Sequence, residues 1–424
     1  MISRESISFS TATFKEFENI EGHDMMATAK YFKEYIDYQK ENNLLNFRFK
    51  TNGCGPETTV SSPFLSQPTT CISLVSNDYL NFTRHPKVIE AAIAGIRQYG
   101  TGAGASPLIG GLHEYHVELE NKLSRFFNRP EGSSIIFTTG YTANSATLLS
   151  LLKAEDCAIV DMEVHASVYE GLLGTHTKKF PHNSMVHLER ALREAKDQYR
   201  TKLVIVDGVY SQNGDLAKLD EIVNLVKSYG AYLMVDDAHG IGVVGETGRG
   251  AAEVYNVLEK VDILSGTLSK ALGHIGGFVV ASPEIVNFLR YQSRQHVFSS
   301  TATPASFGLL KALDLIDEEP HWRKQLHDNV QYFKQGLLTL GVEIGNTESP
   351  IIPIKIGDPV RTAEISRMLL QRSIYANCII YPGVARKDAR IRTSLMATHT
   401  TAQLDAVLNA LEDIGKKVSL KKGR

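Results

Sequence analysis

Short, almost fully apolar runs alternate with helix-like segments through the middle of the chain. Between the runs lie segments of helical period, such as Lys218–Tyr229, which repeats apolar residues on one face before a stop at Gly230. Apolar strands joined by helices predict a parallel sheet with both faces covered, and ligands of such sheets bind at the carboxyl ends of the strands. The runs of strand length are 133–140, 156–161, 201–208, 231–240 and 261–266.

The two ends of the chain follow other patterns. Residues 1–75 predict an N-terminal arm, with a helix around Ala27–Glu41 and a Gly-, Pro-, Ser- and Thr-rich linker or extended stretch from Thr51 to Thr70. The aromatic face of that helix could contact a membrane or a partner subunit, or pack on its own protein. Residues 76–318 form the predicted large domain. A smaller C-terminal α+β domain is predicted over 319–424, where charged helices flank strand-like runs at 351–356, 376–382 and 389–395.

Composition narrows the function classes. The 424 residues are 43% hydrophobic and 22% charged, which is typical of a globular protein with two or three lobes. The formal charge of −2 shows no excess of basic residues of the kind that indicates nucleic-acid binding. No apolar run reaches spanning length and the first residues lack a secretion signal, so we expect a cytoplasmic protein, with peripheral contact at the inner face of a membrane left open. The four cysteines have no ligand spacing, so no metal site is predicted.

The segment GTLSKALGHIGG (266–277) carries the strongest chemical signal. Lys270 follows a Ser/Thr turn directly after an apolar strand, and the glycines after it would let a flat ligand approach closely. A single lysine is ordinarily a solvated surface side chain. A lysine enclosed in such a turn loses basicity by desolvation and can form an imine. Thr267 and Ser269 lie beside it, and the Thr267 hydroxyl is placed to reach a phosphate.

Three further segments place polar side chains at strand ends. In LMVDDAHG, Asp236 ends a strand and His239 follows, and the carboxylate could be a helix cap, a metal ligand or the partner of a protonated heterocycle. FTTGYTAN places Thr139, Gly140 and Tyr141 at a strand-to-helix junction suited to phosphate. His165 follows a third strand, where an imidazole could stack on a ring or be structural. A lysine, a carboxylate and a phosphate cradle together are what pyridoxal 5'-phosphate requires.

These segments, in this order, resemble the α-oxoamine synthases among the fold-type I pyridoxal-phosphate enzymes. The resemblance runs from 76–86 to 394–400, about three quarters of the chain, and rests on SNDYLNFTRHP, GTGAGASPLIGG, HVELE, TGYTAN, HAS, HNSMVHLE, DGVYSQNGD, VDDAHGIGVVGETGRG, GTLSKALG, FSSTATP and SLMATHT. It implies a mostly parallel seven-stranded sheet between helices, with a smaller C-terminal α+β domain. It also implies a homodimer with active sites at the interface.

Motif by motif, the resemblance assigns roles to individual residues. Lys270 would form the imine, Asp236 would pair with the pyridine nitrogen, His239 would bind the ring hydroxyl, and His165 would stack on the ring. Further cofactor contacts would come from Thr139, Gly140, Tyr141, Ser211, Thr267 and Ser269, and from Ser299, Ser300 and Thr301 of the neighbouring subunit. Arg392 would bind the carboxylate of the amino acid, with Asn77 beside it; otherwise Arg392 would be half of a surface ion pair.

The implied reaction joins a small amino acid to an acyl thioester with loss of carbon dioxide, giving an α-amino ketone. ESPIIPI and RTSLMATHT most resemble bacterial serine palmitoyltransferases, so we expect L-serine and a long-chain acyl-CoA, or acyl carrier protein, as substrates. A 2-amino-3-oxobutyrate CoA ligase (glycine and acetyl-CoA) and an 8-amino-7-oxononanoate synthase are alternatives. Pro107 departs from the arginine of many relatives, in a segment that lines the acyl entrance. An aminotransferase or lyase and a non-catalytic partner subunit are more remote, the latter because Lys270 is present.

Overall fold

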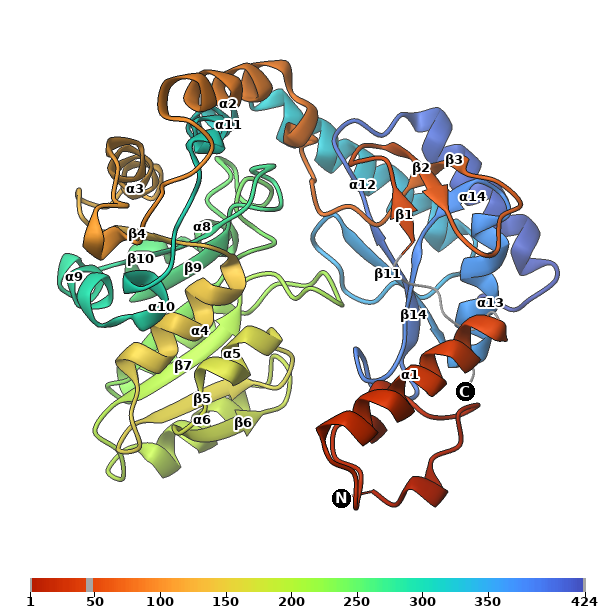
Figure 1. Cartoon of the computed structure of the whole chain (residues 1–424), viewed down its shortest axis with the longest axis horizontal. Helices are drawn as coiled ribbons and strands as arrows, with labels where there is room; N and C mark the ends of the chain where they lie inside the picture. Colours follow the sequence, from red (N-terminus) through yellow and green to blue (C-terminus); the bar gives the residue numbers. More distant parts are fainter. Residues whose placement is uncertain (1, 43–48, 422–424) are drawn as a thin grey trace.

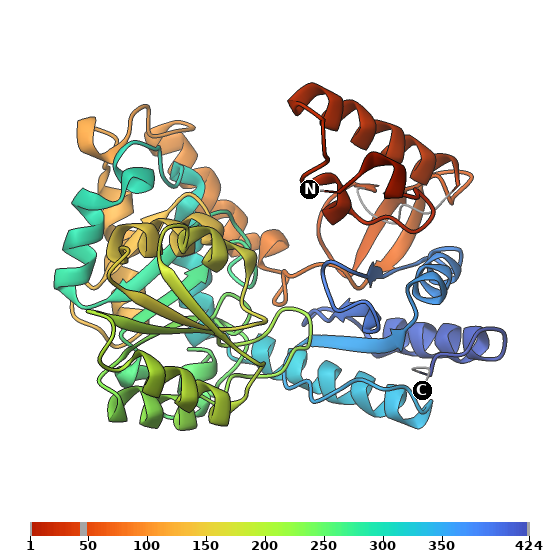
Figure 2. The same cartoon turned by 90° about the horizontal axis from the view of Figure 1, so that it is seen from below.

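The computed structural model describes residues 2–42 and 49–421. Residues 1, 43–48 and 422–424, which belong to the predicted terminal segments, lie outside the described residues. The chain forms a larger unit around a seven-stranded sheet and a smaller unit that holds both chain ends (Figures 1 and 2). Among the described residues, none of the helices combines the length and hydropathy that a membrane crossing requires.

The large sheet has the strand order β4-β10-β9-β8-β7-β5-β6. Only β10 runs antiparallel to its neighbours, which confirms the expected mostly parallel seven-stranded sheet. Its strands are β4 (Ser134–Phe137), β5 (Cys157–Asp161), β6 (His176–Phe180), β7 (Lys202–Asp207), β8 (Tyr232–Asp236), β9 (Ile263–Thr267) and β10 (Gly277–Ala281). The strands β6 and β10 were not among the apolar runs, because β6 is an edge strand of the polar sequence HTKKF and β10 directly follows a glycine cluster.

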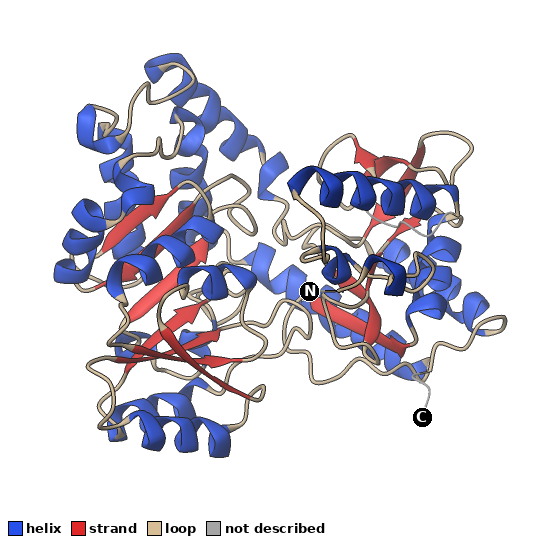
Figure 3. Ribbon diagram, turned by 60° about the horizontal axis from the view of Figure 1, so that its bottom comes forward, coloured by secondary structure: helices blue, strands red, loops and turns tan. Residues whose placement is uncertain are grey.

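Alternation along the strands divides the core of the large unit into two layers. In β4, Ile135 and Phe137 face one layer while Ile136 faces the other, as the two-residue period of a strand requires. One layer packs on α4 (Gly140–Leu151), α5 (Ala166–Gly171) and α9 (Pro283–Gln292). The other packs on α3 (Glu114–Phe126), α6 (Met185–Ala195) and α7 (Leu219–Ser228), so helices cover both faces (Figure 3).

The larger unit is completed by helices around these layers. Helices α2 (Pro86–Tyr99) and α11 (Phe307–Glu318) pack on each other, and a 3-10 helix η4 (Pro107–Ile109) packs on α10 (Arg294–Val297). The short helix α8 (Ala251–Val254) follows the loop after β8.

The smaller unit combines segments from both ends of the chain. Strands β1 (Lys50–Thr51), β2 (Glu57–Ser61) and β3 (Thr69–Ser73) form a sheet with β12 (Ile374–Tyr375). The stretch from 51 to 70 is therefore extended in β2 and at the start of β3, and the end of β3 pairs with the C-terminal part through Ile72 and Ser73. A second sheet has the order β11-β14-β13, formed by β11 (Ile351–Gly357), β14 (Ala389–Ser394) and β13 (Asn377–Ile379). The helices α12 (His321–Thr339), α13 (Pro359–Leu370) and α14 (Thr401–Gly415) complete the unit.

The N-terminal helix α1 (Met25–Glu41) buries its aromatic face within the arm itself. Tyr31 and Tyr35 pack with Phe17 and Ile20 in a small core, and Phe9 contacts both tyrosine rings. Of the alternatives for this face, packing on its own protein is the one found.

Candidate active site

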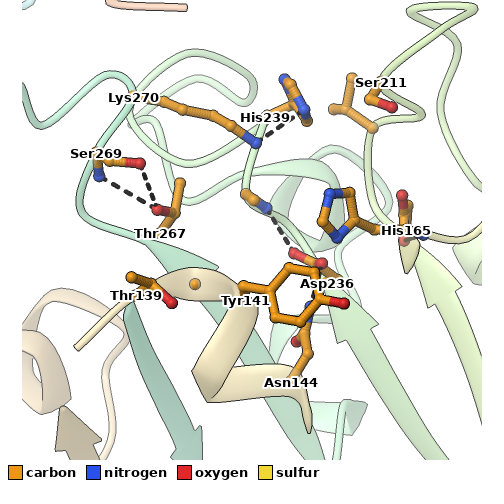
Figure 4. A pocket seen from close by; sticks show the side chains of 14 residues that line it. Thr139, Tyr141, Asn144, His165, Ser211, Asp236, His239, Thr267, Ser269 and Lys270 are labelled. Carbon is orange, nitrogen blue, oxygen red and sulfur yellow. Dashed lines mark hydrogen bonds between the residues drawn. The ribbon is translucent and has the colours of Figure 1, made fainter. Parts of the chain in front are cut away.

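Loops at the carboxyl ends of five strands enclose a cavity of about 240 Å³. The strands β4, β5, β7, β8 and β9 each contribute polar side chains to it (Figure 4). The cavity therefore lies where a parallel sheet binds its ligands. Ten of the predicted residues line it together: Thr139, Gly140, Tyr141, His165, Ser211, Asp236, His239, Thr267, Ser269 and Lys270.

Lys270 is partly buried, three residues beyond the end of β9. Its Nζ lies 2.8 Å from Nε2 of His239. Desolvation lowers the pKa of Lys270 to about 8, even though the nearby Asp236 carboxylate acts in the opposite direction. The amine is therefore neutral in a much larger fraction of molecules near neutral pH than a surface lysine, as a nucleophile or base requires.

His239 connects Lys270 to a buried phenol. Its Nδ1 lies 2.7 Å from the hydroxyl of Tyr79, whose pKa burial raises to about 12. Burial, together with the positive charges of Lys270 and Arg392, holds the pKa of His239 well below its ordinary value, so the imidazole is neutral. A protonated Lys270 then donates to Nε2, and the Nδ1–H donates to the Tyr79 oxygen.

Asp236 is held by hydrogen bonds at the end of β8. Its Oδ2 accepts from Nδ2 of Asn144 at 2.6 Å, and its Oδ1 accepts from the backbone N–H of Ala238 at 3.1 Å. Asn144 is fixed in turn, because its Oδ1 accepts from the Ser265 hydroxyl at 2.6 Å. The carboxylate is therefore aimed into the cavity by a neighbouring helix rather than used as a helix cap.

His165 lies beside Asp236 in the cavity (Figure 4). It caps α5, and its Nδ1 lies 2.8 Å from the hydroxyl of Ser167. Desolvation lowers the pKa of His165, although the Asp236 carboxylate acts against this shift. A neutral, oriented imidazole can pack on a planar ring.

The amino terminus of α4 forms one wall of the cavity. Thr139 caps the helix by accepting from the Thr142 N–H at 3.0 Å. The N–H groups at the very start of an α-helix have no intrahelical acceptor, so they can bind an anion. A side chain at Gly140 would place its Cβ 2.9 Å from Cβ of Thr267, so only glycine lets the helix start this close to β9. Thr267 and Ser269 add hydroxyls beside it, 2.8 Å apart.

Arg392 and Asn77 lie beside this cavity without lining it. Nε of Arg392 donates to the Ser211 carbonyl at 2.6 Å, and Nη2 donates to Oδ1 of Asn77 at 3.2 Å. Nη1 donates to the Ser394 hydroxyl at 2.8 Å, and the guanidinium also hydrogen-bonds the buried hydroxyl of Tyr79. The guanidinium is buried in the described chain rather than half of a surface ion pair.

The segment with Ser299, Ser300 and Thr301 does not reach the cavity of its own chain. The Thr301 hydroxyl instead lies 3.1 Å from Nε2 of His116, and Ser300 is exposed. A role for these three residues in a neighbouring subunit stays a prediction.

Several polar residues at the site were missed at the sequence level. Asp207 ends β7 as Asp236 ends β8, and the parallel register places the two side by side. Burial, with the adjacent Asp236 charge, raises the pKa of Asp207 well above its ordinary value. The sequence signal that could have identified Asp207 was its position at the end of the apolar run TKLVIVDG. Asn144 and Tyr79 stood in the quoted motifs TGYTAN and SNDYL, but nothing in their spacing indicated which strand they would meet.

A family model for class I and II aminotransferases matches residues 69–411. The chain is 41% identical over 352 residues to an 8-amino-7-oxononanoate synthase of Thermoanaerobacter pseudethanolicus, covering 82% of this chain and 89% of that protein. It is 38% identical over 395 residues to 8-amino-7-oxononanoate synthase 1 of Bacillus subtilis, covering 92% and 98%. Among solved structures, serine palmitoyltransferase of Sphingomonas wittichii has a TM-score of 0.87 at 28% identity, covering 93% and 99%.

The chain belongs to the α-oxoamine synthase family. It is a pyridoxal-phosphate-dependent acyltransferase of fold type I. The α-oxoamine synthase cavity also fits this cofactor on its own chemistry. It combines a weakly basic amine, a fixed carboxylate and a helix amino terminus that approaches β9 closely at Gly140.

Proposed function

We propose that this α-oxoamine synthase makes 8-amino-7-oxononanoate. The two halves of this product follow from its name: the terminal methyl group and the carbon that bears the amine come from alanine, and the other seven carbons are an acyl chain with a terminal carboxylate. The substrates would then be L-alanine and the thioester of a seven-carbon dicarboxylic acid. The 41% and 38% identities over most of the chain support this proposal over the expected serine palmitoyltransferase activity.

The observation that carries the proposed chemistry is that Arg392 is bonded to Ser211, which lines the same cavity as Lys270. Ser211 lines the cavity with Lys270, and its carbonyl accepts from Arg392. Arg392 would bind the amino-acid carboxylate, a role that suits a planar, charged guanidinium. The α-carbon would then face the Lys270 amine, the only lysine that lines this cavity among the described residues.

Pyridoxal 5'-phosphate, when bound, supplies an electron sink for the charge that develops on the α-carbon. Asp236 would hold the pyridine nitrogen protonated, and His165 would pack on the ring. Gly140, Tyr141 and Thr267 would hold the phosphate at the start of α4, where backbone N–H groups and the helix dipole favour an anion. Lys270 would remove the α-proton, for which its lowered pKa suits it near neutral pH.

A serine and long-chain acyl-CoA pair is the second candidate. It is favoured by the TM-score of 0.87 to serine palmitoyltransferase, although the identity there is only 28%. Among the described residues, the cavity lining offers hydroxyls but no measured contact that would select serine over alanine.

A substrate screen separates the two candidates. The holoenzyme is mixed with L-alanine, L-serine or glycine, each with the CoA thioester of the seven-carbon dicarboxylic acid, of palmitate or of acetate, and released thiol is measured. We expect thiol release only with L-alanine and the dicarboxylic thioester. Release with L-serine and palmitoyl-CoA would instead establish the second candidate. A screen in which no pair releases thiol, on protein that carries its cofactor, would contradict both.

A further inference from the structure

The loop of residues 208–217 reaches from the large unit into the smaller one. It leaves β7 and is closed into a narrow finger by an antiparallel bridge between Val209 and Leu216. The backbone N–H of Gly214 also donates to the Tyr210 carbonyl at 2.8 Å. Figure 1 shows a loop in the colour of these residues extending toward β11 and β14. We call residues 208–217 the finger.

The tip of the finger holds the strand that carries Arg392. The Ser211 carbonyl accepts from Nε of Arg392 at 2.6 Å. Nη1 of Arg390 donates to the Gln212 carbonyl at 3.0 Å and to Oδ1 of Asn213 at 2.6 Å. The Gly214 carbonyl accepts from the N–H of Glu348 at 2.9 Å. The direction of the Arg392 guanidinium therefore depends on where the finger tip lies.

The base of the finger is fixed by His182, from the motif HNSMVHLE. Nε2 of His182 donates to Oδ2 of Asp215 at 2.8 Å, and Nδ1 donates to Oδ1 of Asp161 at 3.2 Å. The neighbouring Asn183 adds a bond from its Nδ2 to the Leu216 carbonyl at 2.9 Å. Asp161 is fully buried at the end of β5, so this clamp ties the finger to the rigid core of the sheet.

The clamp contains a charged imidazole. Burial opposes the charge, but the hydrogen bonds and negative charges of Asp161 and Asp215 raise the pKa of His182 to about 10. Because the folded-state pKa lies above the ordinary value, the charge is present below pH 10 and is lost only as the pH rises through that value. Both ring nitrogens can therefore donate throughout the neutral range.

We propose that His182 is a positioning residue for the substrate carboxylate, which acts through Asp215 and the finger to aim Arg392. This inference rests on the proposed role of Arg392 in carboxylate binding. His182 does not line the cavity, so it would touch neither cofactor nor substrate. Its loss would leave the cofactor site intact and disturb one property, the preference of the enzyme for an amine that carries a carboxylate.

The test compares affinity for L-alanine with affinity for L-alaninamide, and for L-serine with L-serinamide. Binding is followed by the absorbance of the bound cofactor in the holoenzyme. The ratio of the two dissociation constants in each pair is the carboxylate preference. In His182→Gln we expect this preference to fall about tenfold, because a small misplacement of a binding group weakens orientation. The cofactor absorbance should stay unchanged.

Two further variants complete the experiment. His187→Gln is the matched control, because this exposed histidine of the same motif hydrogen-bonds Ser184, away from the finger, and should keep the full preference. Asp215→Ala removes the acceptor of the His182 Nε2–H without touching the imidazole and should lower the preference as His182→Gln does, even where His182→Gln fails to fold.

A comparison with Arg392→Gln separates this inference from the function on which it rests. If Arg392→Gln lowers the carboxylate preference while folded Asp215→Ala retains it, the clamp does not aim Arg392 and the inference is wrong. If Arg392→Gln retains the preference, the proposed role of Arg392 fails and the inference fails with it. The substrate screen above would still report the reaction independently.

Discussion

At the scale of single residues, the environment of Lys270 sets the pH at which the enzyme can load its cofactor. With a pKa of about 8, against an ordinary 10.5, about 10% of the Lys270 amines are neutral at pH 7, compared with about 0.03% for an unperturbed lysine. The neutral fraction rises with pH and levels off above the pKa. We therefore expect the rate at which cofactor-free protein captures pyridoxal 5'-phosphate to reach half of its plateau near the pKa of about 8 and to level off about one pH unit higher. Stopped-flow absorbance across pH 6–11 measures this rate.

A variant of Asp236 is the control for the predicted pH dependence of cofactor capture. Asp236 favours the charged form of Lys270, so Asp236→Asn should move the midpoint of the rate profile to lower pH. Lys270→Ala should show no capture phase at all. A wild-type midpoint near 10.5 would contradict the lowered basicity that the buried site imposes.

At the scale of elements, the start of α4 is fixed by the absence of a side chain at Gly140. A Cβ there would lie 2.9 Å from Cβ and 3.1 Å from Oγ1 of Thr267, so α4 and β9 must separate in Gly140→Ala. The phosphate cradle would open, and we expect cofactor affinity to fall about tenfold, equivalent to about 1.4 kcal/mol. Titration of cofactor-free protein with pyridoxal 5'-phosphate measures this affinity. Gly415→Ala at the end of α14, where a Cβ meets only ordinary contacts, should keep it; equal affinities in both variants would contradict the cradle.

Much of the large sheet could be predicted from the sequence, because an apolar run bounded by turns is a local signal. The end of β8 at Asp236 and the strand before Lys270 are of this kind. The edge strand β6 and the pairing of β3 with β12 could not be predicted from local pattern. A polar edge carries no apolar run, and a pairing across 300 residues is decided by tertiary packing.

The residues of the candidate site differ in the same way: some are marked by a local sequence pattern, and others depend on tertiary packing. Residues that follow a strand closely, such as Lys270 and His239, can be predicted from the sequence, because the apolar run before them marks where the strand ends. Asn144 meets Asp236 only because α4 packs beside the strands that end at the cavity. His182 follows β6 and meets Asp215, which follows β7, only because both strands flank β5 in the sheet. Contacts of this kind depend on the order of the strands in the sheet, which cannot be predicted from the local pattern of one sequence.

At the scale of the whole molecule, exposed apolar side chains lead us to predict that this chain pairs with a second copy. Ile109 on η4 is 75% exposed, and Phe298 directly after α10 is 73% exposed. Because η4 packs on α10, the two lie on adjoining elements. An apolar patch of this kind is typical of an interface. Members of a symmetric dimer would each offer Ser300, which is exposed and outside the cavity of its own chain, to the other.

A mixed-dimer experiment tests this arrangement of the site. Ser300→Glu would place a negative charge beside the phosphate and should be inactive through like-charge repulsion, and Lys270→Ala should be inactive because it lacks the amine. If Ser300 serves the partner's site, a heterodimer of the two carries both lesions in one site and none in the other. Random mixing of equal amounts gives half heterodimers, so about a quarter of the wild-type sites should be restored.

Thiol release after unfolding and refolding the two variants together measures the recovery. Refolding each variant alone controls for reversion and should give no activity. If Ser300 acted within its own chain, every site of the heterodimer would carry one lesion and the mixture would stay inactive. Sedimentation of Ile109→Asp gives an independent check: a charge in the patch should shift the protein toward monomer, whereas Val186→Asp on the exposed face of α6 should leave the dimer intact.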